Sequence, residues 1–268
     1  MKAAILKGYN KNGCDLEIRG DRVYGRMPLQ KIGAFAEYAA IDASAIAKVP
    51  EYLSDEEAAC VPLTALTALQ AFELMHPKAG ETVFISGGTG SLGAMAIPVA
   101  KSFGLVVITN GNGSSEERVR RLGADRFIDY KKEDYAKVLS DVDYVLDTLG
   151  DRELAKEFRV LKKGGSLVSL RGLPNGEFAA RSGMSFIKRM MFKMAGGKYD
   201  KMASAKNQQY FFIFVHEDGA GLKKISEIFK DTQIEASVDE VFSLDDVNKA
   251  LKKVASGGSK GKTILKIS

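Results

Sequence analysis

From Thr82 onward the chain alternates short apolar segments with glycine turns and amphipathic stretches, and this rhythm limits the folds open to it. The segments TVFIS, LVVIT, RFIDY, VDYVLDT and GSLVSL are predicted to be strands, with helices over residues 92–103 and 116–122 between the first of them. Strands that are apolar at nearly every position are buried on both faces, as in a parallel sheet covered by helices. The sequence therefore predicts an α/β fold built on a doubly wound parallel sheet.

The part before Gly80 has a different pattern. KAAIL and AFAEYAAI are predicted to be short strands, because each is apolar and bounded by polar or glycine residues. A helix is expected to open near Ser54, where three acidic residues suit the helix dipole, and TALTALQAFELM is expected to form a second helix. At the other end, FSLDDVNKALKKVASGGSKGKTILKIS predicts a capped helix, a glycine-rich turn and a final strand.

Composition excludes several classes. With 45 % hydrophobic and 27 % charged residues, the 268-residue chain has the balance of a globular protein, and its two cysteines and two histidines do not suffice for a disulfide framework or a closed zinc site. Lysine and arginine are mixed with acidic residues, so the net charge of +5 favours a solvated surface over nucleic-acid binding. No signal peptide or spanning segment is recognised, and we expect a cytoplasmic protein with no membrane partner.

One basic, methionine-rich stretch, SFIKRMMFKMAGGKY, allows two interpretations. The first is a helix whose apolar face packs on the core, and the second is a helix lying on a membrane surface. The sequence favours the first.

The stretch GGTGSLG holds Gly88, Gly90 and Gly93 in the spacing G-x-G-x-x-G. By itself this spacing is weak, but here it follows the predicted strand VFIS and precedes the predicted helix AMAIPVAKSF, the context of a dinucleotide-binding loop. Gly88 would allow the tight turn, Gly90 the approach of the pyrophosphate and Gly93 close packing of helix on strand. The helix amino terminus would then face the phosphates. The other interpretation is a purely structural turn.

The end of the next strand indicates which dinucleotide is bound. NAD-selective sites usually carry an acidic residue there for the ribose hydroxyls, whereas this strand ends in Thr109 and Asn110. The following SSEER resembles a capping box with Ser114 at the N-cap and Glu117 three residues on. Arg118 would either contact the cofactor or be an ordinary exposed helix arginine. These features predict NADP rather than NAD.

In order along the chain, several segments resemble the zinc-independent quinone oxidoreductase branch of the medium-chain dehydrogenase/reductase family. They include GDRVYGRMPLQKIGAFAEYAAID, LSDEEAACVPLTALTALQAF, the glycine loop, RRLGADRFIDY, LKKGGSLVSLRG and the closing VFSLDDVNKALKKVASGGSKGKTILKI. The resemblance implies a Rossmann domain over residues 63–229 and a GroES-like catalytic β-domain over residues 1–62 and 230–268. The latter is shortened, because CDLEIRG leads straight into DRVYGR where the family has further strands.

The resemblance also implies a set of cofactor contacts. These are Thr67 near the nicotinamide, Thr89, Gly90, Ser91 and Leu92 around the pyrophosphate, Asn110 and Ser114 by the adenosine phosphate, and Tyr130 near the adenine. Leu170, Arg171 and Gly172 would frame the nicotinamide through their backbone, although Leu170 could equally be a core residue. Phe212 and Lys262 occupy positions that line the cofactor cleft in relatives.

No metal is expected, because Leu63 stands where zinc-dependent relatives have a cysteine ligand, and Cys60 is interpreted as structural. The function implied is an NADPH-dependent oxidoreductase that transfers hydride to a quinone or an α,β-unsaturated carbonyl compound. No catalytic residue is assigned, since Tyr24 and Tyr38 are proton-donor candidates by type only. The alternative is an NADP-binding protein that has lost catalysis and acts as a redox sensor or interaction module.

A homodimer is expected from the late strands YFFIFV and GSLVSL. One of the two should end the sheet, and an uncovered apolar edge strand invites pairing with a second chain. Relatives in the family pair their nucleotide domains in this way.

Overall fold

The computed structural model describes residues 3–10, 13–232, 234, 236–257 and 261–267. It divides the chain into two compact units, unit 1 of residues 1–66 and 216–268 and unit 2 of residues 67–215. The long helix α1 (Asp55–Met75) begins in unit 1 and ends in unit 2.

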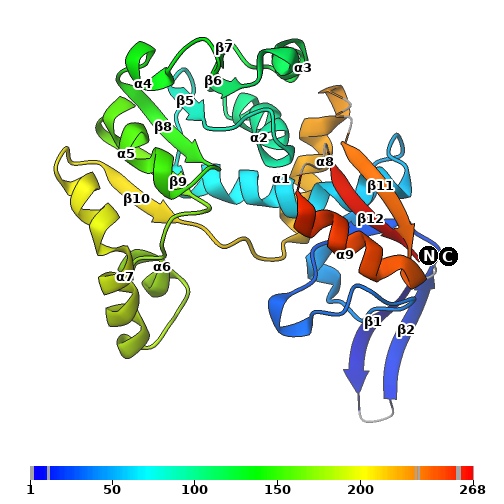
Figure 1. Cartoon of the computed structure of the whole chain (residues 1–268). Helices are drawn as coiled ribbons and strands as arrows, with labels where there is room; N and C mark the ends of the chain where they lie inside the picture. Colours follow the sequence, from blue (N-terminus) through cyan, green and yellow to red (C-terminus); the bar gives the residue numbers. More distant parts are fainter. Residues whose placement is uncertain (1–2, 11–12, 233, 235, 258–260, 268) are drawn as a thin grey trace. The chain divides into compact units, whose positions relative to one another are not determined.

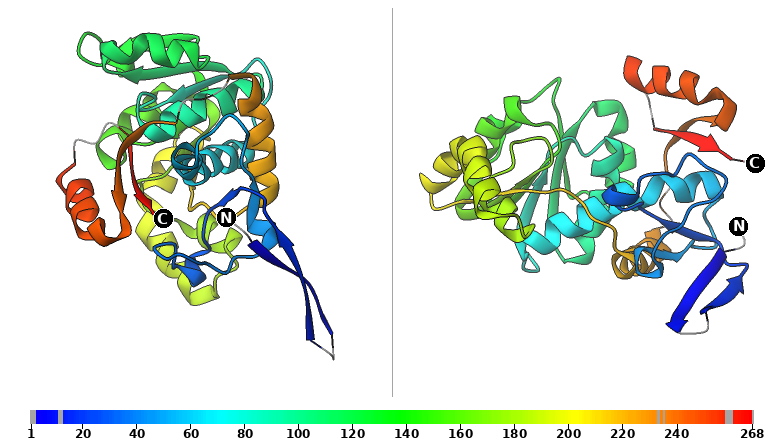
Figure 2. Two further views of the ribbon diagram at one scale, coloured as in Figure 1. Left: turned by 90° about the vertical axis from the view of Figure 1, so that its right-hand side faces the viewer. Right: turned by 90° about the horizontal axis from the view of Figure 1, so that it is seen from below.

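Unit 2 holds a six-stranded parallel sheet (Figures 1 and 2). Its strands are β5 (Thr82–Ile85), β6 (Val106–Gly111), β7 (Arg126–Asp129), β8 (Val142–Asp147), β9 (Leu161–Ser169) and β10 (Gln209–Phe212). They lie in the order β10-β9-β8-β5-β6-β7, which is the Rossmann order, and all five strands predicted in the Thr82–Leu170 region are present. The strand order reverses between β5 and β8, where such sheets bind ligands at the carboxyl ends of the strands.

Helices cover both faces of this sheet (Figure 2). They are α2 (Ser91–Ser102), α3 (Glu116–Arg121), α4 (Tyr135–Val138), α5 (Asp151–Val160), α6 (Gly176–Arg181) and α7 (Phe186–Ser204). The apolar cluster on one face joins strand residues such as Phe84 and Val145 to Leu154 and Phe158 of α5 and Tyr199 of α7. The doubly wound arrangement predicted from the apolar strands is therefore confirmed.

Strand β10 ends the sheet, as we expected for one of the late strands. The amide of Ile213, the residue after β10, donates to the Ser169 carbonyl of β9 (3.2 Å). Because the backbone groups of successive residues in a strand point to opposite sides, those of Tyr210 and Phe212 point away from β9. The carbonyl of Tyr210 accepts a hydrogen bond from Asn175 Nδ2 (3.3 Å), and the carbonyl of Phe212 accepts one from Arg181 (2.9 Å). Edge-to-edge pairing of two chains would have to replace both bonds, and it stays a prediction.

Unit 1 contains three separate two-stranded sheets in its described part. The pairs are β1 (Ala3–Asn10) with β2 (Gly13–Arg19), β3 (Val23–Gly25) with β4 (Ile46–Lys48), and β11 (Val238–Ser243) with β12 (Lys262–Lys266). Its helices are α8 (Gly219–Thr232) and α9 (Val247–Ser256), and short 3-10 turns lie at Leu29–Lys31, Ala43–Ala45 and Leu244–Asp246. The helix and final strand predicted for the tail are present, and the turn between them falls partly on residues outside the described ones.

The strand predicted for AFAEYAAI is wrong. Residues 34–41 form bends and coil, and their side chains are mostly exposed. A strand needs a neighbour for its backbone groups, and no strand among the described residues pairs with this segment. The local apolar pattern was therefore insufficient.

Helix α8 groups with unit 1, whereas the sequence assigned residues up to 229 to the nucleotide domain. The Tyr24 hydroxyl of β3 bonds the Leu222 carbonyl (3.2 Å) and Ser226 Oγ (2.8 Å). At Gly219 an added Cβ would lie 2.4 Å from the Ile46 carbonyl oxygen, so the helix start packs directly on β4. These contacts place the boundary at His216.

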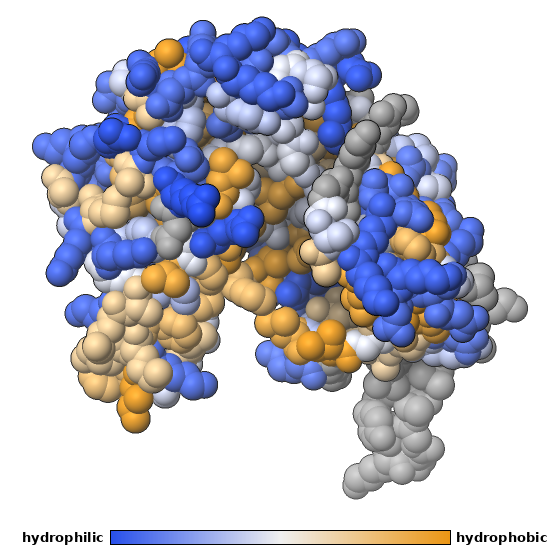
Figure 3. Space-filling view, in the orientation of Figure 1, coloured by the Kyte–Doolittle hydropathy of each residue, from blue (hydrophilic) through white to orange (hydrophobic). Residues whose placement is uncertain are grey.

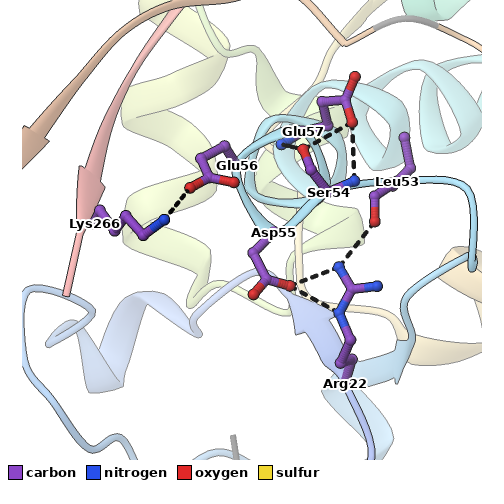
Figure 4. A network of polar contacts seen from close by, with 7 residues as sticks. All are labelled: Arg22, Leu53, Ser54, Asp55, Glu56, Glu57 and Lys266. Atoms are coloured by element: carbon purple, nitrogen blue, oxygen red, sulfur yellow. Dashed lines mark hydrogen bonds and ion pairs between the residues drawn. The ribbon is translucent and has the colours of Figure 1, made fainter. Parts of the chain in front are cut away.

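The amino terminus of α1 is fixed by a reciprocal capping box (Figure 4). The amide of Glu57 donates to Ser54 Oγ (3.2 Å), and Glu57 Oε2 accepts from the Ser54 amide (2.9 Å). Arg22 reaches Asp55 Oδ1 (2.6 Å) and the Leu53 carbonyl (2.8 Å), and Lys266 of β12 pairs with Glu56 (2.8 Å). The predicted helix start near Ser54 is confirmed.

Instead of the two helices predicted here, α1 is one continuous helix with Pro62 inside it. Proline removes a single backbone hydrogen bond, and the fully buried Ala65, Leu66 and Ala68 that follow hold the helix in the core. By length and composition alone α1 could cross a membrane, but 72 % of its most apolar stretch is buried inside the protein. Such burial is typical of a core helix.

Helix α7 only partly follows the favoured interpretation of a helix packed on the core. Gly196, Tyr199 and Ala203 in its second half are buried. In its first half Phe186 and Ile187 are more than 70 % exposed. The interpretation is therefore correct for the second half of the helix and wrong for the first.

Candidate functional site

The site is built on the turn that joins β5 to α2 in unit 2. Gly87 occupies the left-handed region (φ 75°), which a residue with a side chain rarely adopts, and the Gly90 amide closes the turn on the Gly87 carbonyl (3.1 Å). Gly90 is the N-cap of α2, and it provides no side-chain acceptor for the first amides of the helix. Those amides and the positive end of the helix dipole are thus available to an anion.

The three glycines of the motif have different surroundings. An added Cβ at Gly88 would lie 1.8 Å from Thr109 Oγ1, and one at Gly93 would lie 2.3 Å from the Gly88 Cα. At Gly90 the same atom would meet only the Gly87 carbonyl oxygen, at 3.4 Å. Gly88 and Gly93 are therefore required by packing, whereas Gly90 leaves space open to a ligand. The tight turn assigned to Gly88 belongs instead to Gly87, where φ is positive.

The end of β6 holds this turn in place. Asn110 is buried, and its Oδ1 accepts the Gly87 amide (2.7 Å). Thr109 Oγ1 donates to the Ile85 carbonyl (2.7 Å), and the Thr89 side chain packs against Gly111, where an added Cβ would lie 2.1 Å from Thr89 Cγ2. The loop residues and Asn110 that the sequence singled out are thus brought together.

Beyond β6 the chain forms a 3-10 turn, Gly113–Ser115, before α3. The capping box predicted at Ser114 and Glu117 is wrong. Asn112 is the N-cap of the turn, its Oδ1 accepting the Ser114 amide (3.3 Å), and α3 begins only at Glu116. Ser114 is exposed and Arg118 half-buried on this segment, and Tyr130, 57 % exposed, follows β7.

β6 ends without a carboxylate, but the neighbouring strand β7 places one beside this segment. Asp129 ends β7, and an added Cβ at Gly113 would lie 2.5 Å from its Oδ2. Asp129 Oδ1 accepts a hydrogen bond from the Lys131 amide (3.0 Å), and Lys132 Nζ lies 3.9 Å from Oδ2. β6 itself ends without an acidic residue, as predicted, but the adjacent strand β7 brings the Asp129 carboxylate beside Gly113.

A second network orders the ends of β8 and β9. Asp147 is fully buried, and its Oδ1 accepts the amides of Leu149 and Gly150, each at 2.8 Å. Ser169 Oγ donates to Asp147 Oδ2 (2.5 Å) and accepts the Gly172 amide (2.8 Å) and the Arg171 amide (3.2 Å). Asp147 thereby fixes the segment after β8, beside the point where the strand order reverses, and, through Ser169, the segment after β9 that was predicted to frame the nicotinamide.

Beneath these strand ends lies Glu157 of α5, a buried carboxyl group. Within hydrogen-bond geometry, the described residues offer no partner to either of its oxygens or to the buried hydroxyl of Ser86, the residue before the turn, which faces it. Burial raises the pKa of Glu157 well above its usual value, and the charges of Asp147 and Glu153 add to the shift, while the facing Ser86 hydroxyl opposes it. The group therefore favours its neutral form.

We expect Glu157→Gln to stabilise the protein at neutral and alkaline pH. An unfolded glutamate loses its proton near pH 4.3, whereas folded Glu157 keeps its proton to a higher pH. Between the unfolded and the folded pKa of Glu157, the free energy of unfolding of the parent protein therefore falls by about 1.4 kcal/mol per pH unit. Glutamine does not titrate, so the variant does not have this loss. Thermal unfolding should show a small difference at pH 4.5 and a large one at pH 8. The control is Glu117→Gln at an exposed position, and an equal difference at both pH values would contradict the interpretation.

Four other predicted residues belong to elements other than this turn and the strand ends beside it. Thr67 is a buried residue of α1, and Phe212 lies on β10, about 14 Å from β5 at the usual strand spacing, with its ring edge-on to Phe178. Lys262 belongs to β12 in unit 1, where burial lowers the pKa of its amine. Tyr24 is a structural residue, since its hydroxyl is bonded within unit 1 and burial raises its pKa.

The described residues do not fit a zinc ion. Among them no group of three histidine, cysteine or acidic side chains is arranged to hold a metal. Cys60 is buried in α1, its thiol donates to the Glu56 carbonyl (3.4 Å), and burial raises its pKa, which disfavours the thiolate that zinc needs. The structural interpretation of Cys60 agrees with these contacts.

Sequence reasoning missed Asp147, Ser169 and Glu157. A carboxylate and a hydroxyl at the ends of two predicted buried strands were a usable signal for Asp147 and Ser169. Glu157 gave none, because its surroundings in the sequence are those of an exposed helix face.

Comparison with known proteins agrees with this architecture. Residues 122–265 match the family model described as "Zinc-binding dehydrogenase". The chain is 30 % identical over 95 % of its length to the mitochondrial NAD(P)H oxidoreductase RTN4IP1 of Danio rerio, of which it covers 69 %. It is 33 % identical over 70 % of its length to a 2-methylene-furan-3-one reductase of Solanum lycopersicum, of which it covers 50 %.

Among solved structures, the quinone oxidoreductase from Coxiella burnetii superposes with a TM-score of 0.74 at 25 % identity, over 93 % of this chain and 73 % of that one. The family model spans more than half of the chain and includes β8, β9 and the Asp147 and Ser169 network. The glycine turn, the strand order and these matches lead to one conclusion. The chain belongs to the medium-chain dehydrogenase/reductase family, in its quinone oxidoreductase-like branch.

Proposed function

We propose that this oxidoreductase uses NADPH to transfer hydride to a quinone or an α,β-unsaturated carbonyl compound. The observation that carries the proposal is the open space at Gly90 beside the uncapped amino terminus of α2, which suits a pyrophosphate. The nicotinamide cofactor supplies the hydride when bound. The chain's own part is to bind and orient that cofactor through the turn and the Asp147 network.

The substrate class rests on the relatives. The tomato protein is named as a reductase of a furanone that carries an exocyclic double bond, and the Coxiella protein as a quinone oxidoreductase. Both names describe electron-poor acceptors conjugated to a carbonyl. A hydride delivered to the carbon of such an acceptor leaves negative charge on oxygen, which water or a protein donor then protonates. Tyr38, 85 % exposed in unit 1, stays a candidate donor by type only.

Preference for NADPH is supported by the amide of Asn110 at the end of β6 and by Ser114 and Arg118 on the segment beyond it. Asp129 acts in the opposite direction, although Lys131 and Lys132 engage its two oxygens. The balance still favours a 2′-phosphate, because the position that normally accepts the ribose hydroxyls carries no charge.

Asn110→Asp should shift the preference toward NADH. Aspartate keeps an acceptor for the Gly87 amide, so the turn is retained, while its charge repels a 2′-phosphate and accepts ribose hydroxyls. Calorimetric Kd values for NADPH and NADH should change their ratio by about tenfold or more, which corresponds to 1.4 kcal/mol. The control is Asn207→Asp, which adds the same charge in the exposed turn just before β10, at the opposite edge of the sheet. A ratio that Asn110→Asp leaves unchanged would refute the assignment.

The function is tested by following NADPH absorbance after addition of a quinone or an enone, with a saturated ketone as the control acceptor. Consumption with the conjugated acceptors and not with the saturated ketone supports the proposal. The competing candidate, an NADP-binding protein without catalysis, is favoured by the arrangement of the described strands of unit 1 as separate two-stranded sheets. It predicts tight binding of NADPH and no turnover with either acceptor.

A further inference from the structure

The first half of α7 presents an apolar surface that unit 2 leaves uncovered. Its members share one side of the helix and are each about half exposed or more: Phe186 (76 %), Ile187 (72 %), Met190 (48 %), Met191 (65 %) and Met194 (79 %). We call these five residues the α7 face. Figure 3 shows a continuous orange and pale orange area over the region of α7. Contiguous exposed apolar surface of this kind is unusual and marks an interaction site.

The α7 face lies opposite the side by which the helix is attached. Its members recur at spacings of four residues from Phe186 and from Ile187, so they form one stripe along the helix. The attached side carries Phe192, whose ring lies 6.1 Å edge-on from the Phe178 ring, and the buried Gly196, Tyr199 and Ala203. The stripe is thus not a core face.

Rotation of the helix to bury the stripe is blocked. An added Cβ at Gly196 would lie 2.6 Å from Asn175 Cβ and 2.7 Å from the Pro174 carbonyl oxygen, so the two backbones are in direct contact. Asn175 Nδ2 also donates to Asp200 Oδ1 (2.7 Å) on the same helix. The attachment therefore fixes which side of α7 faces outward.

The charged residues in the first part of α7 have one sign. From Phe186 to Tyr199 the helix has no acidic residue and carries Lys188, Arg189, Lys193 and Lys198, whereas Arg181 before it is paired with Glu177 (3.1 Å). By helical spacing Lys188 and Lys193 lie on the two borders of the stripe, from which their long side chains can direct ammonium groups toward an anionic layer. The partner of this face is therefore apolar inside and negatively charged at its surface.

We propose that the α7 face binds the surface of a lipid bilayer that contains anionic headgroups, with α7 lying in the plane of the interface. Phenylalanine, isoleucine and methionine would enter the boundary between headgroups and acyl chains, and the bordering lysines would contact the lipid phosphates. A second copy of the chain fits less well, because a two-fold contact of this face would oppose its cations to the same cations. The sequence predicted no membrane partner, and the exposure of this face is the reason to propose one.

The test is flotation of the full chain with vesicles, and it needs neither cofactor nor substrate. Binding is expected to vesicles of phosphatidylcholine with phosphatidylglycerol, to be weak with phosphatidylcholine alone, and to fall as salt is raised. Ile187→Ser should weaken partitioning by about threefold or more, as expected for loss of a buried isoleucine side chain. The matched control is Ile32→Ser, which removes the same side chain from a position that is 81 % exposed in unit 1 and should leave binding unchanged.

A set of lysine substitutions measures the electrostatic contribution to vesicle binding. Lys188→Gln, Lys193→Gln and Lys198→Gln together should weaken binding by about tenfold or more. The control lowers the net charge equally at exposed positions of unit 1, with Lys223→Gln, Lys230→Gln and Lys252→Gln, and should have little effect. Absence of binding to the anionic vesicles would overturn the proposal, as would equal loss in both members of either matched pair. A dimer in light scattering that Ile187→Ser dissociates would assign the face to a second copy instead.

Discussion

Replacing Gly90 with valine is expected to abolish cofactor binding while unit 2 stays folded. The Gly90 side-chain position is open in the structure, with only the Gly87 carbonyl oxygen near it, and its φ of −76° suits any residue. The branched side chain would instead occupy the space into which the pyrophosphate must approach. NADPH affinity measured by calorimetry should fall by about a hundredfold or more, or 2.7 kcal/mol, while the melting temperature changes little.

Gly93→Ala is the matched variant. It adds a smaller group to the same turn, and we expect it to lower the stability of the fold, whereas Gly90→Val is expected to remove cofactor binding and keep the stability. The Cβ added at Gly93 would lie 2.3 Å from the Gly88 Cα and 2.6 Å from the Gly87 carbonyl oxygen, which are backbone atoms that cannot move aside cheaply. Overpacking of this kind costs about 1–3 kcal/mol or more, so this variant should melt at a lower temperature. Normal NADPH binding by Gly90→Val would make the turn purely structural.

Asp147→Ala should destabilise unit 2 by about 2–4 kcal/mol, because it leaves buried donors without their acceptor. These donors are the amides of Leu149 and Gly150 and the hydroxyl of Ser169. The segment Leu170–Gly172 would lose its anchor through Ser169, and the cofactor should bind more weakly even in the folded fraction. Chemical unfolding and NADPH calorimetry measure the two effects separately.

Two further variants keep this prediction testable if Asp147→Ala fails to fold. Asp147→Asn retains one acceptor oxygen for the amides and should lose less stability. Asp143→Ala changes the amino end of the same strand, where Asp143 accepts the Thr82 amide (2.7 Å) and pairs with Lys162, so it should lower stability without changing the Kd of NADPH. If Asp147→Asn and Asp143→Ala affect the Kd equally, Asp147 has no special role at the strand ends.

The membership of unit 2 in the Rossmann class followed from local patterns. Apolar segments such as VFIS and VDYVLD carry their own evidence of burial on both faces, and the position of Gly88, Gly90 and Gly93 between strand and helix is a feature of neighbouring residues. Such properties depend on period and spacing, which are written in the chain. The capping box of Ser54 and Glu57 is equally local and could have been recognised.

Where sequence reasoning failed, the missing information was the identity of a neighbour distant in the chain. AFAEYAAI has the composition of a strand but pairs with no strand among the described residues, and the carboxylate beside Gly113 comes from Asp129 because β7 lies beside β6. The first half of α7 has the composition of a core helix, yet the contact of Gly196 with Asn175 turns its apolar side outward.

The sequence by itself determined the parallel sheet, the glycine turn at its centre and the family of the protein, because each depends on residues close together in the chain. Only the tertiary structure decided that Asp147 and Ser169 share one network, that the Glu157 carboxyl is buried beneath them, and that Gly90 is the open glycine. The physical reason is that burial and hydrogen bonding depend on which elements become neighbours. That choice is made by the strand order β10-β9-β8-β5-β6-β7, which brings together residues tens of positions apart.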